Sequence, residues 1–142
     1  MKLRPYSATV LALGGVILMG LGVYFVVLRP PLLPEDPRYM GTSFAELQAT
    51  APGLLIWLRR VFWVMGGYMF AAGLLTVYVA LTSFRARAKG AAVIVAITGS
   101  ASIGWMVVVN FLIDSDFKWL LLAFALPWMM ALGLYRFEKG VL

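Results

Sequence analysis

The 142-residue sequence contains neither cysteine nor histidine. Without cysteine the chain has no disulfides, no thiolate nucleophile and no thiol redox chemistry. Without histidine it has no imidazole base, and the two absences together remove the usual ligands of zinc and haem. The sequence therefore predicts no catalytic centre of these kinds, no metal site and no cofactor.

Charged residues are also scarce. They make up 13% of the chain, whereas a soluble domain has about 25%. Hydrophobic residues make up 63%, and the mean hydropathy is +0.92. Such a chain cannot cover its own surface in water, so we predict a membrane protein with a single domain over residues 1–142. The net charge of +6 does not indicate nucleic-acid binding, because the basic residues flank apolar runs as membrane anchors do.

Four apolar runs are long enough to cross a hydrocarbon core of ~30 Å at about 1.5 Å per residue. We read the first as an uncleaved span, because it is longer than the apolar part of a signal peptide and lacks a cleavage site. Pro127, within the fourth run, predicts a kink. The predicted fold is all-α, an integral membrane four-helix transmembrane bundle, with spans at residues 6–28, 61–81, 91–113 and 119–137.

Lysine and arginine are distributed unequally between the two sides of these spans. The two termini and the loop 82–90 hold seven of the twelve and one acidic residue. The loop 29–60 and the hairpin turn 114–118 hold the other five, with five acidic residues. The positive-inside rule then places both termini in the cytoplasm and the loop 29–60 outside, in a multi-pass protein of a bacterial cytoplasmic (inner) membrane.

The long first loop has an ordered character. Four of the seven prolines lie within residues 30–37 and favour extended backbone. Ser43 and Glu46 form the capping-box pattern, which predicts a short helix lying at the membrane interface. Loops of this length are usually functional or disordered. The loop is thus a rigid connector, a docking surface or a lid.

Polar residues within the spans are few. The first three spans carry no charge between their ends, which disfavours proton pumps and voltage sensors. Asn110 and Tyr24 have similar depths and predict a small polar cluster on the outer side. The alternative is one interhelical hydrogen bond, worth about 0.6 kcal/mol.

Two further patterns concern helix packing. Trp105 lies nine residues before the hairpin turn and Trp128 ten residues after it, and they either line an apolar ligand or lipid pocket or simply pack. Small residues recur at every fourth position of the third span and predict a helix-packing face, or a face for self-association. That stripe comprises Ala92, Ala96, Ser100 and Gly104.

One charged constellation remains, on the predicted outer side. Arg59 and Arg60 are candidates to pair with Asp114 and Asp116, or to hold a lipid phosphate, or to serve as interfacial anchors. The two aspartates could bind a divalent cation, but two carboxylates on a surface turn more often face solvent. No catalytic residue is assigned, because no nucleotide-binding, nucleophile or metal-ligand motif occurs.

Together these patterns favour a non-enzymatic accessory or assembly component of a larger membrane complex. Its predicted partners are membrane lipids and another membrane protein or a second copy of the chain. An alternative is an oligomeric transporter or channel subunit, or a lipid-binding protein, for an apolar cargo. A second alternative is a membrane enzyme acting on lipid or isoprenoid, which lacks a convincing general base.

Overall fold

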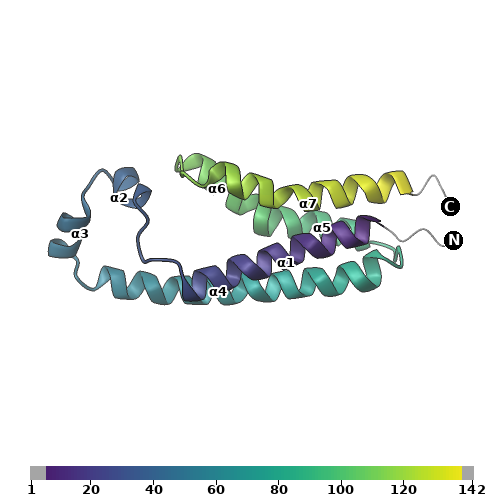
Figure 1. Ribbon diagram of the computed structural model, residues 1–142, viewed down its shortest axis with the longest axis horizontal. Coiled ribbons are helices and arrows are strands. Elements are labelled where there is room, and N and C mark those ends of the chain that lie inside the picture. Colours follow the sequence, from purple (N-terminus) through teal and green to yellow (C-terminus); the bar gives the residue numbers. More distant parts are fainter. Residues whose placement is uncertain (1–5, 139–142) are drawn as a thin grey trace.

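The computed structural model describes residues 6–138, and within that range every regular element is a helix (Figure 1). Four helical rods lie side by side. All four are long and apolar enough to cross a membrane, which confirms the all-α architecture with four candidate spans. The rods are α1 (Tyr6–Val27); α4 (Leu54–Val79) with the π-helical turn η1 (Ala80–Phe84); α5 (Ala91–Gly99) with the π-helical turn η2 (Ser100–Gly104) and α6 (Trp105–Leu112); and α7 (Lys118–Phe137).

The two ends of the bundle differ in kind. The start of α1 and the end of α7 lie together at one end, here called the terminal end (Figure 1). Two short helices, α2 (Glu35–Met40) and α3 (Phe44–Thr50), lie beyond the opposite end, where α4 extends past the other rods. We call residues 28–60 the head. It comprises α2, α3, their connections and the first two turns of α4.

The second rod is longer than its apolar run predicts. It begins at Leu54, before the expected residue 61, and continues to Phe84, for 31 residues in all. The breaker pair Pro52–Gly53 ends just before it, and nothing between 54 and 60 interrupts a helix. The loop expected at 82–90 is shorter and comprises residues 85–90, because no proline or glycine interrupts the helix between 82 and 84.

Glycine pairs bring α1 and α4 into backbone contact. Gly22 faces Gly66, and Gly15, seven residues earlier in α1, faces Gly73, seven residues later in α4. A Cβ atom built on Gly22 would lie 2.6 Å from the backbone nitrogen of Phe70. A repeat of seven keeps the same two faces together over two helical turns. This pair of helices therefore depends on having no side chain at the contact.

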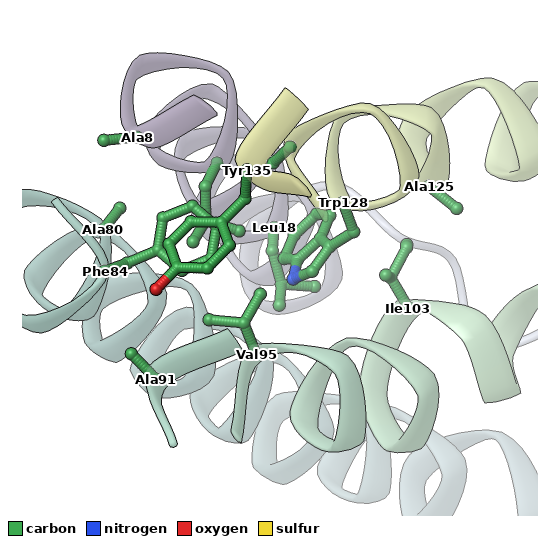
Figure 2. Packing of buried hydrophobic residues seen from close by; sticks show 12 residues of the cluster. Ala8, Leu18, Ala80, Phe84, Ala91, Val95, Ile103, Ala125, Trp128 and Tyr135 are labelled. Atoms are coloured by element: carbon green, nitrogen blue, oxygen red, sulfur yellow. The ribbon is translucent and has the colours of Figure 1, made fainter. Parts of the chain in front are cut away.

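The centre of the bundle is built around Trp128 (Figure 2). Its indole lies between two glycines on different rods. A Cβ atom on Gly14 would lie 2.8 Å from the ring, and one on Gly99 2.5 Å from it. Helix α7 runs on through Pro127, whose ring also meets Gly14. One large side chain thus fills the space that glycines on α1 and α5 leave open.

The packing face of the third rod is displaced by one residue from the predicted stripe. The buried positions are Ala91, Val95, Gly99 and Ile103. The predicted stripe begins at Ala92, which is partly buried, and continues through Ala96, Ser100 and Gly104, which line the rim of a groove beside α7. Both stripes have a period of four, so the spacing alone did not show which one faces the core.

Candidate functional site at the head of the bundle

A buried carboxylate ties the head to the hairpin turn between α6 and α7. Glu35 is 3% exposed, and its Oε1 accepts a hydrogen bond of 3.0 Å from the hydroxyl of Ser115, which is 1% exposed. The Ser115 Oγ in turn accepts from the backbone N–H of Phe117 at 3.1 Å. The second oxygen of Glu35 has no hydrogen-bond partner among residues 6–138. This contact fixes α2 against the bundle.

Arg29 fixes the start of the head in a different way. Its guanidinium lies 3.5 Å from the centroid of the Phe62 ring, a cation–π contact between the end of α1 and α4. It donates to the carbonyl of Pro30 at 3.0 Å and lies 3.9 Å from Asp36. Burial lowers the pKa of Arg29, and the charge of Asp36 opposes that shift. The proline-rich segment is therefore held by a nearly buried cation.

Helix α3 begins at the predicted capping residue. The Ser43 hydroxyl accepts from the backbone N–H of Glu46 at 3.2 Å. The Glu46 carboxylate accepts from the Thr42 hydroxyl at 2.8 Å, whereas the capping box predicts the Ser43 N–H as its donor. The residues of α3 are otherwise outward-facing, and none is buried.

The two aspartates of the hairpin turn are occupied by other partners than those considered from the sequence. Asp114 pairs with Lys118, whose hydrogen bond lowers the pKa of the aspartate. Asp116 accepts from Arg38 at 2.9 Å, and this bond raises the pKa of the arginine. The pairing of Arg59 and Arg60 with these aspartates is therefore not formed. The reason is that α2 places Arg38 closer to the turn.

Arg59 and Arg60 lie instead at a groove of the head. The groove has a volume of about 460 Å³ and is otherwise mostly apolar. Pro31, Phe44 and Trp63 are among its walls. Both arginines are exposed, and neither has an ion pair or side-chain hydrogen bond within the part of the chain that the structure describes.

The structure does not join Asn110 to Tyr24. The Asn110 Nδ2 donates to the carbonyl of Met106 in its own helix at 2.9 Å. The same local bonding recurs within the rods, where threonine and serine hydroxyls donate to the carbonyl four residues earlier. These donors are Thr76, Thr82, Thr98 and Ser102. Within the described rods these side chains donate to carbonyls of their own helix and do not form a shared polar site.

The two tryptophans considered as pocket walls have separate surroundings. Trp128 is 4% exposed and lines a second groove, of about 290 Å³, between the third rod and α7. Trp105 is 63% exposed and does not line it. Ile103 and Val107 face this groove. Trp105 lies midway between them in the sequence, so its side chain points to the opposite side of the helix.

Several residues that organise the two ends were not singled out by the sequence. At the head these are Glu35, Ser115 and Arg29. At the terminal end they are Ser7, Arg87, Tyr135 and Glu138, which together form a cluster. One signal was available, since Glu138 is the only acidic residue on its predicted side of the membrane.

No three acidic side chains among residues 6–138 gather closely enough to hold a metal ion. The described residues thus form an apolar bundle with a groove beside which two arginines have no partner among them. Comparison with protein families, with curated proteins and with solved structures finds no match to the chain.

Proposed function

We propose that the protein is a non-enzymatic component of a larger membrane assembly, and that its head docks a different membrane protein. The observation that carries this proposal is the exposed apolar surface of an otherwise fixed head. Glu35 and Arg29 hold the segment in place, yet large apolar side chains on it face outward. These are Tyr39, Met40, Phe44, Ile56 and Trp57. A fixed apolar surface of this kind is typical of protein or membrane contact sites.

The character of the rods supports a structural role over transport or catalysis. Asn110 and the threonine and serine donors named above bond to their own helix backbone, so they form no line of groups for an ion or a proton to follow. The hydrogen-bond networks between elements lie at the two ends of the bundle, where they fix its shape.

The second groove gives the alternative of an apolar cargo one supporting observation. It is open along the bundle and lined by small residues and Trp128. A protein that carries an apolar molecule there, alone or as an oligomer, would purify with that molecule bound. Native mass spectrometry of the protein extracted in lipid nanodiscs distinguishes the two functions, because an accessory component arrives with a larger membrane protein.

Photo-crosslinking in membranes of the native host tests the docking proposal directly. A photoreactive phenylalanine analogue at Phe44 or Tyr39 is expected to give one discrete adduct with another protein. The matched control is Tyr78, an equally outward-facing aromatic residue on α4 near the terminal end. Adducts with lipid alone at Tyr39, which does not line the groove of the head, or equal protein adducts from all three positions, would refute docking through the head.

The proposal includes an orientation, with both termini in the cytoplasm and the head outside in a bacterial cytoplasmic membrane. It rests on the distribution of lysine and arginine. Because the chain has no cysteine, single cysteines report on sidedness without background. An impermeant maleimide is expected to label Gln48→Cys in intact cells with a permeable outer membrane, and Ala86→Cys only after lysis. The reverse pattern would overturn the orientation.

A further inference from the structure

The groove of the head combines apolar walls with two arginines, and the docking proposal does not use the arginines. One wall is the proline-rich segment leaving α1, another is Phe44 at the start of α3, and the third is the first turns of α4. Apolar side chains such as Leu32, Ile56 and Trp63 make up most of it. Its volume of about 460 Å³ lies within the range of small-ligand sites.

Two cations at this groove have no counter-charge in the part of the chain that the structure describes. Arg59 and Arg60 are adjacent, exposed and unpaired within residues 6–138, and Arg60 lies 5.0 Å from the centroid of the Trp63 ring. The other two arginines of the head differ, since Arg29 is covered by Phe62 and Arg38 is bonded to Asp116. The positive charge of the head that has no partner among the described residues is thus concentrated beside the mostly apolar groove. A phosphate diester suits guanidinium groups because they offer paired N–H donors in one plane.

The level of the groove along the bundle fits a lipid headgroup. Gly66 is where α4 touches α1, and Arg60 lies six residues before it, about 9 Å further along the helix axis at 1.5 Å per residue. This is the level at which α1 ends, as the contact between Phe25 and Phe62 shows. Arginines at the end of a span lie among lipid phosphates, while the side chains deeper on α4 lie among acyl chains.

We infer that this groove binds one anionic phospholipid of the surrounding bilayer, with its phosphate between Arg59 and Arg60 and an acyl chain along the apolar wall formed with Trp63. The walls are held before the lipid arrives, because Arg29 fixes the segment at Pro30 and the prolines limit its freedom. Preorganisation of this kind reduces the cost of binding. The groove shares Phe44 and Ile56 with the docking surface proposed above, but its test does not require a protein partner.

The test is native mass spectrometry of the protein released from nanodiscs that contain equal amounts of phosphatidylglycerol and phosphatidylcholine. We expect one phospholipid to be retained, with phosphatidylglycerol preferred. The double variant Arg59→Gln/Arg60→Gln is expected to lower that preference by about tenfold, as the loss of two charge-assisted contacts implies. The matched control is Arg85→Gln/Arg136→Gln, which removes the same charge from exposed arginines near the terminal end.

Two further measurements keep the inference open to refutation. Ile56→Asp places a negative charge on an exposed wall of the groove and is expected to abolish the preference without unfolding the bundle, which circular dichroism checks. An equal loss of phosphatidylglycerol from the control would show that only surface charge matters. Displacement of the lipid by millimolar inorganic phosphate would show a site for free phosphate. Either result overturns the inference.

Discussion

Glu138 accepts hydrogen bonds from both the backbone N–H and the hydroxyl of Ser7, at 3.1 and 2.6 Å, although 131 positions separate the two residues in the chain. The first N–H groups of a helix lack acceptors within it, and a negative charge is favourable at that end. A carboxylate following α7 therefore caps α1. Arg87 donates to the same carboxylate at 3.2 Å and to the carbonyl of Tyr135 at 2.9 Å, so the connection before α5 joins the cluster.

Removing this carboxylate is expected to destabilise the whole bundle. Glu138→Ala leaves Ser7, which is buried, without its acceptor, and leaves the half-buried Arg87 without its counter-charge. The expected loss of unfolding free energy is about 1–3 kcal/mol, the usual cost of an unsatisfied buried polar group. Denaturant unfolding in a mild detergent, followed by circular dichroism, measures it. Glu46→Ala, the same change on exposed α3, serves as the control, and equal losses in both variants would contradict a clamp at Glu138.

The contact between α1 and α4 predicts a sharp difference between two neighbouring glycines. A methyl group at Gly22 meets the backbone of α4, whereas one at Gly20 meets nothing within 4 Å. Gly22→Ala is therefore expected to lose about 1–3 kcal/mol of unfolding free energy through overpacking, and Gly20→Ala to change it by less than about 0.5 kcal/mol. The same unfolding assay applies. Equal behaviour of the two variants would show that the helices are not in backbone contact.

The four rods could be predicted from the sequence because hydrophobic length is a local property. The length of an apolar run sets whether a helix can cross a membrane, and no knowledge of its neighbours is needed. The start of α4 shows the limit of that approach. Polarity at Arg59 and Arg60 suggested the end of a span, but helix formation depends on breakers, and Pro52–Gly53 is the actual boundary.

The candidate site was less predictable, because it depends on which side chains face one another. Asn110 and Tyr24 have matching depths, yet an amide in a helix can bond to the carbonyl one turn earlier and needs no partner. Arg59 and Arg60 do not pair with the hairpin aspartates, because Arg38 and Lys118 occupy these carboxylates. Depth along a helix follows from counting residues, but rotation about its axis follows from packing alone.

Trp128 and Trp105 provide a test of that rotation. Trp128→Ala removes the side chain that fills the space between Gly14 and Gly99, and is expected to cost about 3–5 kcal/mol of unfolding free energy, as other buried tryptophans do. Trp105→Ala removes an outward-facing ring on α6 and is expected to cost much less. Unfolding of both variants in one detergent decides the matter, and a larger cost at Trp105 would reverse the assignment of core and surface.

The hairpin turn predicts a dependence on acidic pH, whose sign follows from Asp114. The hydrogen bond and charge of Lys118 lower the pKa of this exposed carboxyl below its ordinary value of 3.8. An acid with a lowered pKa stabilises the fold above its unfolded pKa, and this contribution is lost as the pH falls through the lower folded value. Protonation is thus expected to loosen the turn only below about pH 4, and to leave it intact at neutral pH.

Carboxyl carbon chemical shifts in a titration by nuclear magnetic resonance measure this pKa directly. The wild-type Asp114 is expected to titrate below 3.8, and the Lys118→Gln variant to return it toward that value, since the shorter amide side chain removes the charge. Arg38→Gln is the companion variant. It breaks the bond to Asp116 and is expected to raise the pKa of Asp114 less, because Arg38 contributes only a weaker charge effect there. If Arg38→Gln has the larger effect, the turn is held by the contact with α2 and not by its own ion pair.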